Sequence, residues 1–116
     1  MSANERHLTI AKQIVKSARE QRNQAIKTIA EEDKRLRWDT AEKLTKARFD
    51  IDYASHFIRC FNKGSRSVEL YKESLTRKLL DNQLRGGSSS AMFNAIEAIE
   101  RDVISYMLRT LFTYEK

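Results

Sequence analysis

The sequence predicts an all-α protein, folded as an elongated antiparallel bundle of three to four helices. Two observations predict this class. The chain contains no proline, and no glycine occurs from Met1 to Lys63, so nothing in this long N-terminal segment forces the backbone out of a helix. Apolar residues recur through the same segment at the three- and four-residue spacing of an amphipathic helix. At 116 residues, the whole chain, 1–116, is expected to form a single helical domain.

The first helix is expected to begin near Ser2 or Asn4, which are favourable N-caps, and to end near Glu32. Its apolar positions fall on one face at about 100° per residue. They are Leu8, Ala11, Ile14, Val15, Ala18, Ala25, Ile26 and Ile29. Arg22 lies in the middle of that face, either buried against an acid of another helix or with its stem reaching the edge.

A break is expected at about residues 33–39, where the apolar pattern lapses. Asp39 and Glu42 then have the spacing of a capping box, which marks the start of a new helix. The sequence leaves open whether residues 4–61 form one very long helix or two helices stacked end to end.

The second helix is expected from Thr40 to about Phe61. It carries an aromatic residue at every fourth position: Phe49, Tyr53, Phe57 and Phe61. Such a series can stack nucleic-acid bases, but aromatic side chains at helical spacing more commonly form a core because they bury a large area. We therefore predict that this series belongs to the core.

Two further helices complete the predicted bundle. Gly64 is suited to a left-handed C-cap of the second helix. A third helix is expected from Ser65 or Ser67 to about Leu84, and a fourth from about Ala91 to Thr113. The inward residues of the third are predicted to be Val68, Tyr71, Leu75, Leu79 and Leu80. The connections between helices are short, and short connections make antiparallel neighbours.

The fourth helix is apolar on most of its circumference, and such a helix must be buried on more than one side. One stripe consists of Met92, Ile96, Ile99, Val103, Tyr106 and Met107. Ile104, Leu108 and Leu111 lie on a different side of the helix from that stripe. Two neighbouring helices of so short a chain cannot cover both sides. We therefore expect a homo-oligomer with Ile104, Leu108 and Leu111 at the interface between copies.

The charge is positive and unevenly distributed. The chain holds 22 basic and 16 acidic side chains, a net charge of +6. Residues 1–85 hold 19 basic and 12 acidic side chains, whereas residues 86–116 hold 3 and 4. Such a surplus attracts polyanions or acidic protein surfaces, and it lies in the N-terminal part of the chain.

A row of cations on the first helix is the strongest functional signal. Lys12, Lys16, Arg19 and Lys27, together with Asn23, fall within an arc of about 80° and span ~22 Å of helix axis. Lys34, Arg35 and Arg37 follow, beside the only tryptophan, Trp38. A linear row of cations suits contact with a phosphate backbone, whereas Lys16–Glu20 and Lys27–Glu31 pairing along a solvated helix is the structural alternative.

These residues predict non-enzymatic binding of nucleic acid by charge and shape, with DNA and RNA both open. The alternative is a protein-interaction module (an adaptor, chaperone or small inhibitor) that docks on an acidic surface of a partner. We expect no membrane segment and a cytoplasmic location, because the chain lacks a long apolar stretch and an apolar leader.

No catalytic, cofactor or metal site is expected. Asp52, His56 and Cys60 share one helix face, but a zinc site needs further ligands of this kind, and His7 is the only other imidazole. Cys60 is near the end of a helix whose dipole disfavours a thiolate. The acids mostly have basic partners four residues away, as on solvated helices. These pairs are Glu42–Lys46, Lys46–Asp50, Arg48–Asp52, Glu73–Arg77 and Arg77–Asp81.

Overall fold

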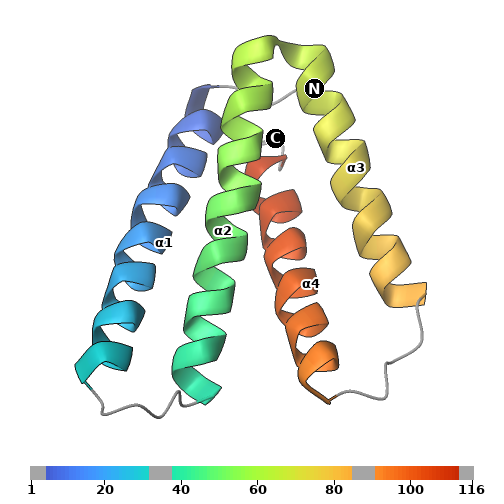
Figure 1. The fold of residues 1–116 in the computed structure, drawn as a ribbon. Coiled ribbons are helices and arrows are strands. Elements are labelled where there is room, and N and C mark those ends of the chain that lie inside the picture. Colours follow the sequence, from blue (N-terminus) through green and yellow to red (C-terminus); the bar gives the residue numbers. More distant parts are fainter. Residues whose placement is uncertain (1–4, 32–37, 85–90, 113–116) are drawn as a thin grey trace.

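The structure, a computed structural model, describes residues 5–31, 38–84 and 91–112 (Figure 1). Its helices are α1 (Glu5–Glu31), α2 (Trp38–Lys63), α3 (Ser65–Leu84) and α4 (Ala91–Leu111). The described residues contain no strand, so the prediction of an all-α bundle is confirmed. The helices run alternately down and up, and the extents of 49 × 33 × 25 Å make the bundle elongated.

The first half of the chain is a helical hairpin. The break between the first two helices is confirmed, because α1 ends at Glu31 and α2 begins at Trp38. End-to-end stacking was a wrong expectation: α1 and α2 lie side by side and antiparallel (Figure 1). The physical reason is that each helix has an apolar face, and folding back buries both faces against each other.

Alanines form the seam of this hairpin. Ala11, Ala18 and Ala25 recur every seven residues on α1, as do Ala47 and Ala54 on α2, and all five are buried. A seven-residue repeat keeps one side of a helix against its partner along its whole length. Because alanine is small, two helices that pack through it can approach closely.

Gly64 joins α2 to α3. Its φ of 121° is a conformation that side chains with a Cβ rarely adopt, and its amide donates to the carbonyls of Cys60 and Phe61, both at 3.2 Å. The Gly64 carbonyl then accepts from the amide of Val68 at the start of α3. The predicted C-cap is therefore confirmed, and it makes the sharp reversal between the two helices.

An aromatic layer holds α2, α3 and α4 together. The ring of Phe57, fully buried, meets Phe112 edge-on with centroids 5.6 Å apart, and it also meets Tyr71. The Tyr71 hydroxyl donates to the Tyr53 carbonyl. The other members of the four-residue series, Phe49 and Phe61, are partly buried and pack against this core. The predicted core role of the aromatic series is confirmed.

α4 has more neighbours than the sequence led us to assume. It packs against α1, α2 and α3, whereas we expected only two neighbouring helices. Ile104 and Leu111, which we expected at an interface between copies, are 1% and 0% exposed inside this chain's own core. Leu108 is partly buried and packs against the same core. Covering these three side chains therefore does not require a second copy.

Some side chains predicted to face the core are half-exposed. Leu80 is 52% exposed and Ile26 is 50% exposed, so both predictions were wrong. Among the described residues, α3 contacts α2 and α4 but not α1, and only its Leu75–Leu79 side is covered. Arg22 on α1 is partly buried, which excludes the fully buried alternative. No described helix is long and apolar enough to cross a membrane.

Candidate nucleic-acid interface

Three cations of the predicted row lie together around one hollow between α1 and α2. Lys12, Lys16 and Arg19 line it from α1, and all three are exposed. Ser55, Ile58 and Arg59 line it from α2. The hollow has a volume of about 650 Å³ and an apolar base formed by Val15 and Ile58. An apolar base with a rim of cations suits a chain of phosphates that passes over it.

The alanine seam explains why these cations meet. In the sequence, Lys12, Lys16 and Arg19 each come directly after a buried residue of α1, namely Ala11, Val15 and Ala18. They therefore stand beside the contact with α2 instead of pointing straight away from it. Glu20 and Asn23 line the same hollow, so one carboxylate and one amide stand among the cations.

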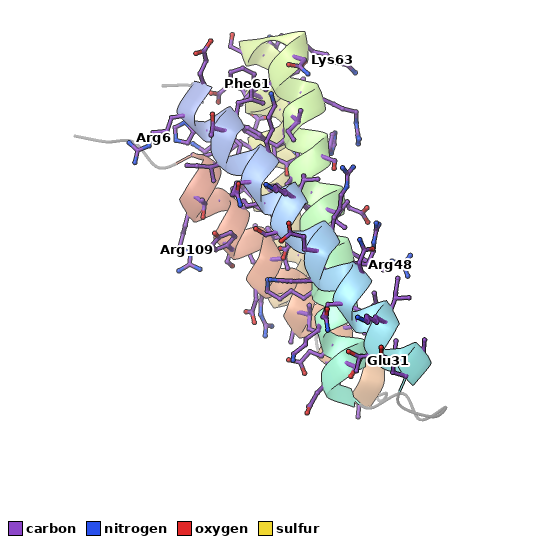
Figure 2. The ribbon with its side chains drawn as sticks, turned by 90° about the vertical axis from the view of Figure 1, so that its left-hand side faces the viewer. Arg6, Glu31, Arg48, Phe61, Lys63 and Arg109 are labelled. Carbon is purple, nitrogen blue, oxygen red and sulfur yellow. The ribbon has the colours of Figure 1, made fainter. Side chains whose placement is uncertain are left out.

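Arg59 is the residue of this site that sequence reasoning missed. It lies on the outer side of α2, and only the antiparallel pairing of the helices brings it opposite the α1 row. The sequence feature that could have revealed Arg59 is a strip of polar residues at helical spacing on α2: Arg48, Asp52, Ser55, Arg59 and Lys63. Figure 2 shows Arg48, a member of this strip, pointing outward from the molecule.

The rest of the predicted row is not part of the hollow. Lys27 is exposed on the same face of α1 but does not line the hollow. Lys34, Arg35 and Arg37, and the loop at residues 85–90, lie outside the described residues. The cations Arg101 and Arg109 belong to α4, and Arg109 points outward on the opposite side of α1 from Arg48 (Figure 2).

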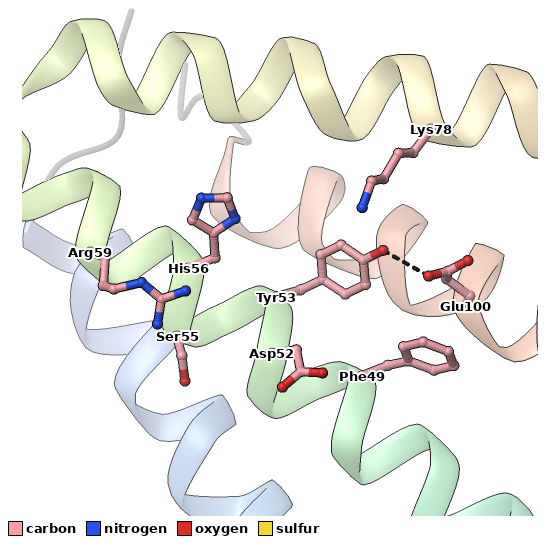
Figure 3. Close-up of a pocket in the computed structure, with 8 residues that line it drawn as sticks. All are labelled: Phe49, Asp52, Tyr53, Ser55, His56, Arg59, Lys78 and Glu100. Atoms are coloured by element: carbon pink, nitrogen blue, oxygen red, sulfur yellow. Dashed lines mark hydrogen bonds between the residues drawn. The ribbon is translucent and has the colours of Figure 1, made fainter.

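A second hollow of about 530 Å³ lies on the other side of α2, between α2 and α3 (Figure 3). Ser55 and Arg59 line both hollows, so the two adjoin along the outer surface of α2. The remaining lining residues come from three helices: Phe49, Asp52, Tyr53 and His56 from α2, Lys78 from α3 and Glu100 from α4. The hollow exists because α3 diverges from α2 below Gly64 (Figure 1).

The contacts in this second hollow hold its walls in place. The Tyr53 hydroxyl donates to Oε2 of Glu100 at 2.9 Å, and Nζ of Lys78 lies 5.3 Å from the centre of the Tyr53 ring. Burial, with the bond to Glu100, raises the pKa of Tyr53 well above its usual range. The hydroxyl therefore stays protonated and remains a donor to Glu100.

His56 lies in the same hollow, beside Tyr71. Its ring meets Tyr71 edge-on with centroids 5.0 Å apart. Partial burial lowers the pKa of His56 below its usual value of 6.5, and the nearby charges of Arg59, Lys78 and Lys63 lower it further. The charges of Arg59, Lys78 and Lys63 therefore all act on His56, in a hollow that Asp52 and Glu100 also line.

The Asp52, His56 and Cys60 set does not come together as a metal site. Asp52 and His56 line the second hollow, whereas Cys60 is buried in the core. Among the residues that the structure describes, no three His, Cys, Asp or Glu side chains are grouped to hold a metal ion. Lys46 and Asp50 do form the pair expected from their spacing, at 2.8 Å, with Asp50 almost fully buried.

Comparison of the chain with protein-family models, with curated proteins and with solved structures gives no match.

Proposed function

We propose that this protein is a non-enzymatic nucleic-acid-binding protein, and that the phosphate backbone lies along the face of α1 and α2. The convergence of Lys12, Lys16 and Arg19 with Arg59 around one hollow carries this proposal. Cations on two helices can contact a backbone from both sides, which a row on a single helix cannot do. If the α1 row were only a solvated helix face, there would be no reason to expect an arginine opposite it on α2.

The dimensions of the face suit several phosphates. From Lys12 to Lys27 the α1 row extends for ~22 Å, and a strand of B-form DNA carries about six phosphates over that length. The cations can follow such a strand without reading base edges. The contribution of these cations to binding would therefore be independent of sequence and would release counterions from the nucleic acid.

The test is a charge reversal on the α1 side of the hollow. Lys16→Glu with Arg19→Glu is expected to weaken binding to every nucleic-acid sequence alike. The slope of log affinity against log salt decreases in magnitude by roughly 0.7–0.9 for every phosphate that the protein no longer neutralises, so the double variant should lower it by about 1.4–1.8. Fluorescence anisotropy across a salt series measures both effects.

Arg66→Glu with Arg109→Glu is the matched control. It changes the net charge by the same amount, and both arginines are exposed and line neither hollow. The proposal is wrong if the control weakens binding equally, or if the wild-type chain has no measurable affinity for nucleic acid at ~50 mM salt. In the latter case, an acidic protein surface becomes the better candidate partner for the same cations.

Self-association remains a prediction and is not needed for this binding face. Among the described side chains of α4, Tyr106 and Phe93 are large, apolar and 45% and 47% exposed. Sedimentation velocity of the wild-type chain checks it. A monomer at all concentrations would contradict the prediction and leave the α1–α2 face unchanged.

A further inference from the structure

The second hollow contains three kinds of group that can bind a nucleotide. Phe49 offers an aromatic ring that is only partly buried. Asp52 and Glu100 offer carboxylate oxygens, which accept hydrogen bonds from the amino groups of bases. Arg59 and His56 offer positive or protonatable groups at one end of the hollow, and Lys78 lies over the Tyr53 ring (Figure 3). No other described hollow combines aromatic rings with both charges.

The position of this hollow connects it to the backbone-binding face. Arg59 and Ser55 line both hollows, so a strand whose phosphates contact Arg59 passes the mouth of the second one. The base of the nucleotide that carries this phosphate can then reach across α2 into the second hollow. The volume of about 530 Å³ lies within the range of roughly 300–1,000 Å³ found for small-molecule sites.

We infer that the second hollow takes one unstacked nucleobase, and therefore that the ligand of this protein is a single-stranded nucleic acid. This inference rests on the proposed function. In a duplex the bases are paired and stacked, and none can enter a lateral hollow without being flipped out at a cost of a few kcal/mol. A single strand has no such cost, and ring stacking against aromatic side chains is a general means of holding its bases.

The side chains around the base have separate roles. Phe49, whose ring is tilted by 34° to the Tyr53 ring at a centroid distance of 6.4 Å, stacks on the base with its exposed part, because Lys78 already covers Tyr53. Asp52 and Glu100 favour bases with an exocyclic amino group, and thymine and uracil lack one. The Tyr53 hydroxyl holds Glu100 in position through their hydrogen bond. Cytosine, adenine and guanine are therefore preferred over thymine and uracil.

The first experiment compares strands that differ only in their bases. Oligo(dC), oligo(dT) and an abasic phosphodiester strand of equal length carry equal charge. Oligo(dC) is expected to bind about fivefold or more tightly than the abasic strand, the lower end of the effect of one stacked base. Oligo(dT) is expected between them, and a duplex of equal length below oligo(dC). Oligo(rC) shares bases and phosphates with oligo(dC) and is expected to show the same gain over an abasic strand.

The second experiment removes the stacking ring. Phe49→Leu keeps an apolar side chain but is expected to reduce the affinity for oligo(dC) about fivefold, with no effect on the abasic strand. Phe61→Leu is the matched control, because Phe61 is also a partly buried phenylalanine of α2 and lines neither hollow. Circular dichroism of both variants checks that the fold is retained.

Several results would overturn this inference. Equal binding of oligo(dC) and the abasic strand, with a steep salt dependence, would contradict the base site and leave the proposed phosphate contact intact. Equal or tighter binding of the duplex would contradict the single-stranded ligand. A reduction of affinity in Phe49→Leu that is equal for both strands would show that Phe49 acts through the fold. Failure of every strand to bind would instead refute the proposed function itself.

Discussion

The α1–α2 pair and the α2–α3 pair differ in the size of the side chains that join them. Alanines repeat along the α1–α2 seam, and α1 contacts α2 more extensively than any other helix. Large side chains, among them Tyr71 and Phe57, join α2 to α3, and these two helices diverge from Gly64 (Figure 1). Small residues bring helix axes together, whereas large ones hold them apart.

This difference determines which kind of hollow each pair forms. The close α1–α2 pair forms the first hollow at its surface, with the cations Lys16 and Arg59 on its two sides. The divergent α2–α3 pair opens a second hollow, to which α4 also contributes through Glu100. A basic hollow and a mixed, aromatic hollow therefore lie on either side of one helix, and α2 is the element common to both.

The largest effect is expected from a cavity in the layer of large side chains. Leu75 on α3 is 1% exposed, and Leu75→Ala is expected to lower the free energy of unfolding by about 2–5 kcal/mol. Leu70→Ala on the same helix is the control, because Leu70 is 54% exposed and its truncation should cost about 0.5 kcal/mol or less. Urea unfolding measures both. Equal destabilisation would show that α3 is not held by this layer.

Overpacking of the alanine seam is expected to have the next largest effect. Ala54 is fully buried, so Ala54→Leu must push α1 away from α2 and is expected to cost about 1–3 kcal/mol. Ala30→Leu adds the same atoms at an exposed position of α1 and should be nearly neutral. If Ala54→Leu leaves the midpoint of urea unfolding unchanged, the seam is not closely packed and the comparison of the two pairs fails.

The reversal at Gly64 is expected to contribute less. A Cβ at this position would have no atom within 4 Å, so the cost of Gly64→Ala comes from the positive φ alone, about 1–2 kcal/mol. Gly64→Asn should cost less, because asparagine tolerates positive φ better than alanine does. Thermal unfolding compares the two variants, and an alanine variant as stable as wild type would contradict strain at this reversal.

The smallest expected effect is a pH dependence that arises at His56. Because burial and nearby cations lower its pKa in the folded chain, the unfolded chain binds the proton more readily. Stability is therefore expected to fall as the pH drops below about 6.5, the usual pKa of histidine. His56→Gln should reduce this fall. An identical pH profile in the variant would show that the field around His56 is weak.

Much of the architecture could be predicted from local sequence patterns. The absence of proline, the position of Gly64 and the apolar spacing predicted a bundle of three to four helices, and the expected helix ends are close to those observed. The cations Lys12, Lys16 and Arg19 were predicted to share a face because the period of a helix is a local property. The core role of the aromatic series followed from the same period.

Only the tertiary structure decided how these helices lie against one another. That α1 folds back on α2, that Arg59 then faces the α1 row, and that Lys78 and Glu100 meet at Tyr53 all depend on residues far apart in the sequence. The same packing placed Ile104 and Leu111 inside the core, where the sequence had favoured a contact between copies. Helical period specifies which residues share a face, but the neighbour that covers that face depends on competition among all the apolar surfaces of the chain.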